Sequence, residues 1–202
     1  VTRGTSEGLL VPSGKTDPTI AMFVLPHAPL PRAVYEKGIR ACIAEVNINK
    51  GSPADGKKTL NYIANILFRM DSRENGFEDA IFMNSDGSVT EATSSNLFIV
   101  DGKKIYTPPV KSGILPGITR EEIIRLVRRR SARAIQEKCI KKNDLFDADE
   151  LFLTNSISEV VPVVKVGGRT IGRGSPGKVT GDIASLFKAS VGEYCSIAGK
   201  KT

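Results

Sequence analysis

The sequence has no tryptophan, one histidine, three cysteines and few aromatic residues, which make up 6% of its 202 residues. With His27 as the one histidine, this chain cannot build a histidine-rich metal site or a Ser-His-Asp triad from its own residues. Cys42, Cys139 and Cys195 are too widely spaced for a zinc knuckle and too few for a disulfide scaffold. Catalysis is therefore left to lysine, glutamate, tyrosine or a cofactor, in a reduced, cytoplasmic setting, with no metal expected.

Long apolar runs are also missing. No stretch approaches the ~18 residues of a membrane-spanning helix, so we expect no membrane partner. The chain begins with VTRG at residues 1–4, without an initiator methionine or an apolar signal core, and we expect an internal piece of a longer protein. Hydrophobic residues at 40% and charged residues at 25% are close to the globular average and predict a sizeable buried core.

The positive charge is modest and scattered. Lysine and arginine total 29 against 22 acidic residues, a formal net charge of +7. The densest run, at residues 128–130 with Arg133, falls within a helical pattern of apolar residues that extends to Ile135, so these arginines are expected on a solvated face. Since aromatics are few and no nucleic-acid motif is present, we expect no nucleic-acid partner.

Strand and helix patterns are mixed along the chain. Strands are expected at residues 20–25, 38–47, 80–84, 96–100, 104–107, 150–154 and 160–166, and helices at 60–76, after 117, and at 177–195. Thr119 and Glu122 have the spacing of a capping box. Tight turns within residues 80–107 favour antiparallel pairing there. The order predicts an α+β or mixed α/β fold, with a boundary near residue 30 in a proline-rich stretch.

A pair of lysines stands between a polar loop and an apolar helix pattern. Lys57 and Lys58 follow the loop at residues 51–56 and precede the helix pattern at residues 60–76. Two lysines beside a loop are ordinarily solvated. A desolvated lysine amine, however, loses its proton readily and can form a Schiff base with an aldehyde, so either lysine is a candidate nucleophile.

Glu91 is the one acidic residue in the run VTEATSSN at residues 89–96, just before the apolar residues 97–100. A carboxylate at this place is either exposed at a strand end or aimed at a buried cation. A pyridinium nitrogen is such a cation, because a neighbouring carboxylate keeps it protonated and strengthens the ring as an electron sink.

Two polar turns have the composition of a phosphate site. Residues 117–119 (Gly-Ile-Thr) open a predicted helix, where unpaired N–H groups bind anions without lysine or arginine. Residues 154–156 (Thr-Asn-Ser) follow a predicted strand. Each alone is consistent with an ordinary cap or turn. Together with the amine and the carboxylate, they match the aldehyde, ring nitrogen and phosphate of pyridoxal 5′-phosphate (PLP).

The same segments resemble, in order, the signature of a known enzyme family. They are KTLNY at residues 58–62, TEATSSNLF at 90–98, LPGITR at 115–120 and DELFLTNSISE at 149–159. They are similar to those of the class IV, fold-type IV PLP enzymes, which include branched-chain aminotransferases, D-amino-acid aminotransferases and 4-amino-4-deoxychorismate lyases. The resemblance extends over essentially all of residues 1–190 and implies the large C-terminal domain of a D-amino-acid aminotransferase-like fold.

The resemblance also implies roles for single residues. Lys58 matches the lysine that forms the Schiff base with PLP and moves the α-proton, and Glu91 matches the partner of the pyridine nitrogen. The other matches are Tyr62, near the active-site tyrosine; Ile118, Thr119 and Ser156, at the phosphate; and Ile157 and Ser158, at the substrate carboxylate. Lys57 remains a rival of Lys58, because branched-chain enzymes usually place one more residue between the lysine and the Asn-Tyr pair.

The family's two-domain plan implies that residues 1–30 are a remnant of the small N-terminal domain plus a linker, and residues 31–202 the large PLP-binding catalytic domain. Most of the small domain is then absent. Two features of the family are missing with it: an arginine that clamps the phosphate, and the aromatic residues of the substrate pocket. Residues 6–10 (SEGLL) lack the arginine and histidine with which D-amino-acid aminotransferases hold the substrate carboxylate. This departure disfavours the D-specific activity.

The activity implied is transfer of an amino group between an amino acid, of branched-chain type, and a 2-oxo acid. The family also implies a homodimer, because a loop of the other subunit completes the active site. An aminodeoxychorismate lyase, which eliminates pyruvate, is the alternative. Two features favour it: the short spacing from Lys58 to Asn61, and the turn at residues 154–157, which branched-chain enzymes more often fill with Gly, Thr and Ala.

Overall fold

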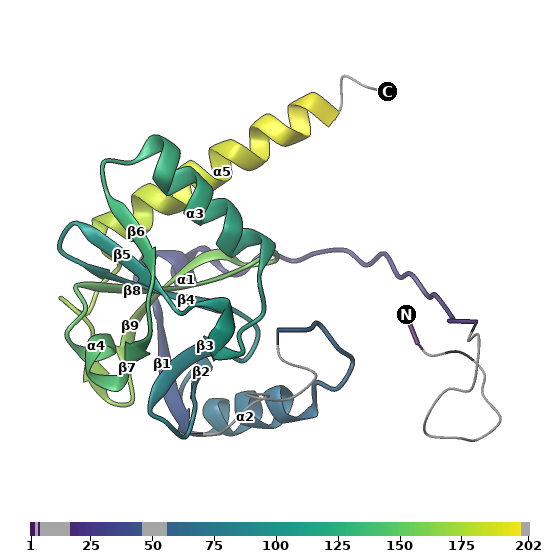
Figure 1. The fold of residues 1–202 in the computed structure, drawn as a ribbon, viewed down its shortest axis with the longest axis horizontal. Helices are drawn as coiled ribbons and strands as arrows, with labels where there is room; N and C mark the ends of the chain where they lie inside the picture. The colour runs from purple at the N-terminus through teal and green to yellow at the C-terminus, as the bar shows by residue number, and fades with distance from the viewer. Residues whose placement is uncertain (3, 5–16, 46–55, 199–202) are drawn as a thin grey trace.

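The structure is a computed structural model that describes residues 1–2, 4, 17–45 and 56–198 (Figure 1). Its helices are α1 (Arg32–Lys37), α2 (Ile63–Glu74), α3 (Ile118–Arg130), α4 (Lys142–Phe146) and α5 (Lys178–Ala198), with a 3-10 helix η1 (Val110–Ser112). Its strands are β1 (Ile39–Glu45), β2 (Asp79–Met83), β3 (Ser88–Ala92), β4 (Asn96–Asp101), β5 (Lys104–Thr107), β6 (Ala134–Glu137), β7 (Ile140–Lys141), β8 (Glu150–Asn155), β9 (Glu159–Val166) and β10 (Arg169–Thr170). The mixed α/β class expected from the sequence is confirmed.

The strands form one sheet of ten strands in the order β6-β5-β4-β8-β9-β1-β2-β3-β7, with β10 paired to β9. As expected for residues 80–107, β2 pairs antiparallel with β3, and β4 with β5. β1 instead lies parallel to both β2 and β9, and β5 lies parallel to β6. Parallel neighbours need a crossover connection, and α2 lies in the connection between β1 and β2.

Alternate residues of β4 enter different cores, as the period of a strand requires. Leu97 and Ile99 belong to the main core on one face of the sheet, whereas Phe98 belongs to the cluster packed beneath α3 and α5. In that second cluster Phe98 and Phe152 of β8 stack with ring centroids 4.9 Å apart. Figure 1 shows α3 and α5 together against this part of the sheet and α2 apart from them, near β1 and β2. The sheet is thus packed on both faces around β4 and β8.

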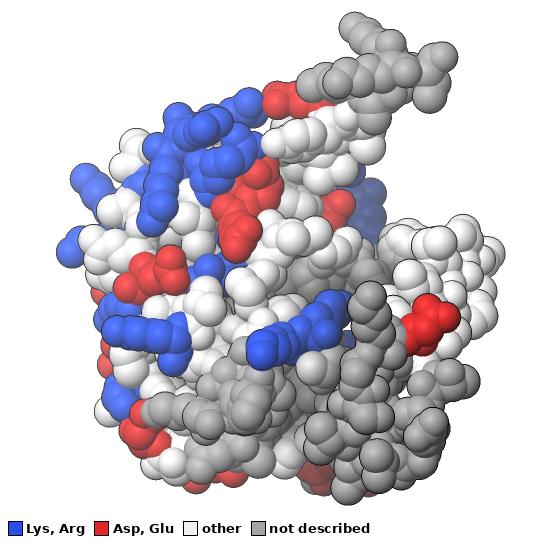
Figure 2. Space-filling model, turned by 45° about the vertical axis from the view of Figure 1, so that its right-hand side comes forward, with Lys and Arg blue, Asp and Glu red and all other residues white. Residues whose placement is uncertain are grey.

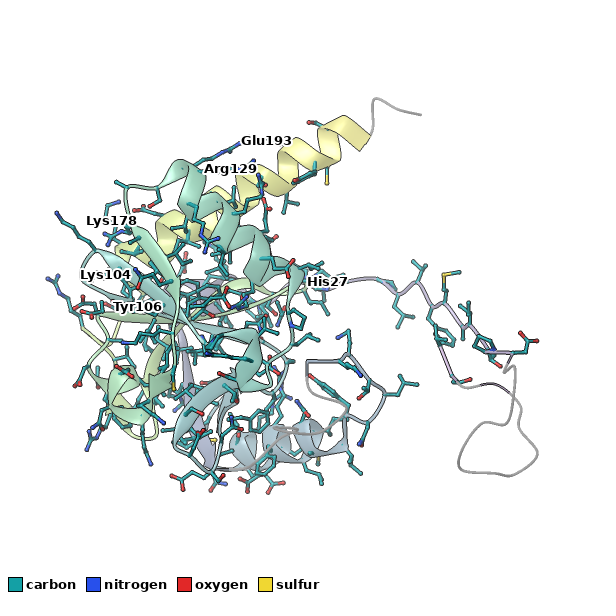
Figure 3. The ribbon with its side chains drawn as sticks, in the orientation of Figure 1. His27, Lys104, Tyr106, Arg129, Lys178 and Glu193 are labelled. Atoms are coloured by element: carbon teal, nitrogen blue, oxygen red, sulfur yellow. The ribbon has the colours of Figure 1, made fainter. Side chains whose placement is uncertain are left out.

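The expected buried strand at residues 20–25 is wrong. These residues have no regular structure, and their apolar side chains are exposed, with Met22 88% and Val24 98% exposed. This segment runs away from the sheet (Figure 1), and His27, two residues after it, lies on the same extended stretch (Figure 3). The apolar run predicts a strand, but within the described part of the chain no strand of the sheet pairs with it.

The capping box expected at the start of α3 is also wrong. Gly117 is the N-cap and supplies no side-chain cap, and Thr119 lies inside the first turn. Glu122 instead pairs with Arg125 and accepts a hydrogen bond from the Ser190 hydroxyl of α5 at 2.6 Å. Its pKa is held below the ordinary value chiefly by the Arg125 hydrogen bond.

Three further boundaries differ from expectation. α3 ends at Arg130 because Ser131 adopts an extended backbone, so Ile135 lies in β6 and not on the helix. α2 is shorter than expected, and the apolar face predicted for it is exposed, with Ile63 65% and Leu67 58% exposed. β1 ends at Glu45, and residues 46–47 lie outside the described residues, as do residues 6–10 and 51–55. In the part of the chain that is described, no helix is long and apolar enough to cross a membrane.

Candidate active site

Glu91 is a half-buried carboxylate near the end of β3. Its Oε2 accepts two hydrogen bonds, from Asn96 Nδ2 and from the Leu115 backbone N–H, each 3.1 Å long. Within the described ranges, no lysine or arginine forms an ion pair with it. Burial raises the pKa of Glu91 to about 7, although the Leu115 N–H and the charges of Arg120 and Lys58 act in the opposite direction. Glu91 is therefore a half-buried acid that has no ion-pair partner among the residues the structure describes.

The start of α3 lies directly beside this carboxylate. Leu115, which bonds to Glu91, is followed after Pro116 by the N-cap Gly117 and the first helical residues, Ile118 and Thr119. Ile118 is 72% exposed and Thr119 is buried. The first N–H groups of an α-helix have no intrahelical acceptor, and no side chain caps those of α3. This is the arrangement that binds an anion.

Arg120 follows in the same helical turn, but its side chain is bound to other parts of the fold. Its guanidinium is buried, pairs with Glu137 of β6 at 2.7 Å and donates to the Pro108 carbonyl at 2.9 Å. Its charge still acts on Glu91 and lowers the pKa of that carboxyl.

Lys58 and Tyr62 belong to the segment that leads into α2, and Tyr62 is the N-cap of that helix. Lys58 is exposed and close enough for its charge to lower the pKa of Glu91. The Tyr62 hydroxyl donates to the Thr93 carbonyl, which also accepts a hydrogen bond from Asn65 Nδ2 at 2.7 Å. Burial, followed by the charges of Glu91 and Asp79, raises the pKa of Tyr62. The start of α2 is thus attached to the turn that follows Glu91.

The turn between β8 and β9 holds the remaining predicted residues. Ser156 and Ile157 are exposed, and Ser158 is half-buried. Asn155 Oδ1 accepts hydrogen bonds from the N–H groups of Ile157 at 2.9 Å and Ser158 at 2.6 Å. The backbone N–H groups of the two residues expected at the substrate carboxylate are therefore bonded within the turn itself.

Asn155 also joins this turn to the Glu91 region, because its Nδ2 donates to the Ser95 hydroxyl at 2.8 Å. One residue further, Asn96 is the register partner of Thr154 in the β4–β8 pair. The predicted residues on β3, α3 and the β8–β9 turn are thereby connected through Ser95 and Asn96. Sequence reasoning gave no role to Asn96 or Asn155, although both are amides inside the quoted motifs.

Comparison with known families decides how these residues are classified. Residues 1–166 match the sequence model of the family described as amino-transferase class IV. The chain belongs to the class IV aminotransferases. The family indicated by the four motifs is confirmed.

Two curated relatives illustrate the range of this aminotransferase family. The branched-chain-amino-acid aminotransferase of Escherichia coli strain K12 is 33% identical over 183 residues, which is 89% of this chain and 59% of that protein. The D-alanine aminotransferase of Bacillus licheniformis is 37% identical over 134 residues, which is 66% of this chain and 47% of that protein. The chain therefore spans about half the length of these relatives.

Solved structures give the same grouping. The branched-chain amino acid aminotransferase of Thermobaculum terrenum, in its PLP-form, superposes with a TM-score of 0.75 at 29% identity, covering 81% of this chain and 54% of that chain. The Escherichia coli branched-chain amino acid aminotransferase superposes with a TM-score of 0.72 at 32% identity, with the same coverage of 81% and 54%. The fold described here is that of part of these enzymes.

Proposed function

We propose that the protein containing this chain is a PLP-dependent aminotransferase that moves an amino group between an amino acid, of branched-chain type, and a 2-oxo acid. The observation that carries the proposal is Glu91, a half-buried carboxylate with a raised pKa and no ion-pair partner among the described residues; it is bonded to the segment that leads into an uncapped helix start, and the charge of Lys58 acts on it. Family membership and the branched-chain relatives support it.

The residues present fit PLP. Both hydrogen bonds to Glu91 fall on Oε2, so Oε1, to which no described group donates, is left as an acceptor for a protonated ring nitrogen. The N–H groups of Ile118 and Thr119 and the exposed Ser156 hydroxyl are suited to its phosphate. The full set that would hold the cofactor is Lys58, Tyr62, Glu91, Ile118, Thr119 and Ser156. When bound, PLP supplies an aldehyde carbon and a ring that withdraws electrons from the substrate's α-carbon.

The side chains of this chain then have distinct tasks. The Lys58 amine, in its neutral form, can accept a proton from the substrate's α-carbon and return it, and its position near Glu91 is suited to this task. The Glu91 carboxylate holds the proton of the ring nitrogen in place. The N–H groups of Ile157 and Ser158 become available to a substrate carboxylate once the Asn155 side chain rotates away.

Lys58 is proposed over Lys57 for a reason that depends on position. The charge of Lys58 contributes to the pKa of Glu91, whereas Lys57 is not among the groups that affect it. A lysine that shares one small ligand with Glu91 must lie close to that carboxyl. This supports Lys58 as the cofactor lysine.

A coupled assay tests the activity. The purified protein, supplied with PLP, should form glutamate from 2-oxoglutarate when leucine, isoleucine or valine is the amino donor. Mixing without 2-oxoglutarate serves as the blank. A protein that binds PLP but transfers no amino group from any of the three amino acids contradicts the branched-chain proposal.

One observation favours the second candidate, an aminodeoxychorismate lyase. Asn155 Oδ1 occupies both N–H groups that would bind an α-carboxylate. In 4-amino-4-deoxychorismate the amine is on a ring carbon without a carboxylate, so such a substrate does not need those N–H groups. Pyruvate release from this compound, measured beside glutamate formation from leucine, separates the two activities.

We also propose a homodimer with small-molecule substrates. The exposed apolar face of α2, defined by Ile63, Ile66, Leu67 and Met70, supports an interface between copies.

Nucleic acid is not proposed as a partner, because basic side chains on α3 have acidic neighbours: Arg130 pairs with Glu193 of α5 at 3.1 Å. Figure 2 shows red patches among the blue ones, and Figure 3 labels Arg129 and Glu193 on these two helices.

The domain division and the setting are proposals as well. Residues 17–30, which lie apart from the sheet with exposed apolar side chains, support a small-domain segment and linker at residues 1–30, and residues 31–202 form the catalytic domain. A cytoplasmic setting is supported by Cys42, Cys139 and Cys195, all of which are free thiols.

A further inference from the structure

Asn96 is the first residue of β4 and is only 5% exposed. Its backbone is fixed by the sheet, since it is the register partner of Thr154 on β8. A buried amide that does not face the apolar core needs hydrogen-bond partners, and those of Asn96 belong to the candidate active site.

The Asn96 amide nitrogen binds two different parts of that site. Nδ2 donates to Glu91 Oε2 at 3.1 Å and to the Leu115 carbonyl at 2.8 Å. Leu115 N–H in turn donates to the same Glu91 oxygen at 3.1 Å. Glu91, Asn96 and Leu115 therefore form a closed ring of three hydrogen bonds. Two of these bonds end on Glu91 Oε2, and the third ends on the Leu115 carbonyl.

The other end of the amide lies against the helix start. A Cβ placed on Gly117 would be 2.1 Å from Asn96 Oδ1, so glycine is what allows the N-cap of α3 to come this close. Gly117 has φ −73°, an angle open to any residue, which means that the requirement is for space and not for backbone freedom. Asn96 thus touches the segment that leads into Ile118 and Thr119 as well as the carboxylate.

We propose that Asn96 is a positioning residue that sets the distance between the acceptor for the cofactor's ring nitrogen, Glu91, and the phosphate-binding start of α3. This inference rests on the proposed PLP function. A rigid ligand held at both ends gains from both contacts only if their spacing is fixed beforehand. The sheet fixes Asn96, and Asn96 fixes both ends.

Asn96→Ala in the purified protein tests this role. We expect the affinity for PLP, measured by titration of the protein without cofactor, to fall about tenfold to a hundredfold, as for loss of a hydrogen bond to a charged group. Affinity for pyridoxal, which lacks the phosphate, should fall less, because only one end of the ligand is then held. Equal losses for PLP and pyridoxal, or no loss, would overturn the proposal.

Asn84→Ala is the matched control. Asn84 is equally buried and donates to a backbone carbonyl, that of Ser112, at 3.2 Å, but among the described residues no hydrogen bond joins it to Glu91 or to α3. We expect it to change PLP affinity less than threefold, on the order of a purely structural effect. If wild type itself fails to bind PLP, the proposed function fails, whereas normal binding by Asn96→Ala refutes only the role of Asn96.

A second readout does not need the cofactor. The pKa of Glu91, followed by carbon-13 NMR of its carboxyl, should rise further in Asn96→Ala, since a donor to the ionised form is lost. The Leu115 N–H and the charges of Arg120 and Lys58, which lower the pKa of Glu91, are unchanged in this variant. A loss of stability alone would not move this pKa, and an unchanged value contradicts the proposal.

If the alanine variant does not fold, Asn96→Asp takes its place, because it keeps the shape of the side chain. It replaces the donor by a second carboxyl facing Glu91, so the two share a proton at low pH and repel each other when both are ionised. PLP affinity should therefore be weaker at pH 8 than at pH 6 relative to wild type. The same relative affinity at both pH values would count against Asn96 as the residue that holds Glu91.

Discussion

The Thr93 hydroxyl donates a hydrogen bond to Oδ1 of the buried Asp79 at 2.5 Å. The same oxygen of Asp79 also accepts the Ala80 N–H at 2.9 Å, and the Thr93 N–H donates to the Ala80 carbonyl at 3.1 Å. The Thr93 carbonyl is the acceptor to which Tyr62 binds. A buried carboxylate therefore fixes the turn on which the start of α2, with its lysine, is held.

Thr93→Val removes this hydroxyl with little change in shape. Because a buried carboxylate then loses a partner, we expect the free energy of unfolding to fall by about 1.5–3 kcal/mol in urea denaturation. Thr90→Val is the control, since the Thr90 hydroxyl is also buried but donates to a neutral acceptor, the Phe82 carbonyl, at 3.1 Å. Thr90→Val should lower the free energy of unfolding by about 1 kcal/mol. A larger loss in the control than in Thr93→Val would show that Asp79 does not depend on this bond.

Glu91 gives the protein without cofactor an unusual dependence of stability on pH. Its folded-state pKa, about 7, lies above the ordinary value of 4.5, so between these values the folded state holds more protons than the unfolded state. Stability from this group is therefore fully present below pH 4.5 and is lost as the pH rises through 7. The loss should approach about 3 kcal/mol.

Glu91→Gln isolates this contribution because it cannot titrate. Between pH 4.5 and pH 8, the free energy of unfolding of wild type should fall relative to that of Glu91→Gln as the pH rises. A difference that is constant over this interval would mean that Glu91 titrates near its ordinary pKa.

Lys58 and Lys57 can be separated chemically. After reduction with borohydride in the presence of PLP, peptide mapping should find the pyridoxyl group on Lys58. Lys58→Ala should abolish this labelling, and Lys57→Ala, as the matched variant one residue away, should retain it. Labelling that survives in Lys58→Ala and disappears in Lys57→Ala would reverse the assignment and give the lysine spacing usual in branched-chain enzymes.

The strands with strong apolar character were predictable because their partners lie in the same chain. β4 and β8 pair residue by residue over residues 96–100 and 150–154, which closely match the expected ranges. Residues 20–25 have the same apolar character, but in the described part of the chain no strand pairs with them, so composition alone misled. The helix predicted after residue 117 is longer than the observed α3 for a related reason. Ile135 continues the apolar pattern, although the backbone becomes extended at Ser131 and Ile135 lies in a strand.

Candidate site residues could be named from the sequence where a residue type carries the chemistry. Lys58 and Glu91 could be singled out because amines and carboxylates are few within these motifs. Hydrogen bonds between distant residues could not be read from the sequence, because they depend on register: Asn96 meets Leu115, 19 residues away, and Asn155 meets Ser95, 60 residues away. The contact of Asn155 with Ser95 follows from the pairing of β4 with β8, whereas Leu115 belongs to the segment before α3 and to neither strand.

The apolar face of α2 gives a prediction for assembly. Ile63→Lys and Leu67→Lys place charges on side chains that are 65% and 58% exposed, so they should leave the fold intact. If this face joins two copies, sedimentation at micromolar concentration should report a dimer for wild type and a monomer for the double variant. Ile118→Lys, on an exposed apolar residue outside this face, is the control for added charge. A dimer that survives the double change would place the interface elsewhere.

Asn155→Gly tests whether the β8–β9 turn limits the substrate. The change removes the oxygen that occupies the N–H groups of Ile157 and Ser158 and leaves both free for a carboxylate. If the substrate is an α-amino acid, the KM for leucine should fall about tenfold with little change in kcat, as expected for one gained hydrogen bond to a charged group. Ser95→Ala is the control, because it removes the partner of Asn155 Nδ2 but leaves Oδ1 in the turn. An unchanged KM for leucine, together with undiminished pyruvate release from aminodeoxychorismate, would instead favour the lyase, whose substrate has no α-carboxylate for these N–H groups to bind.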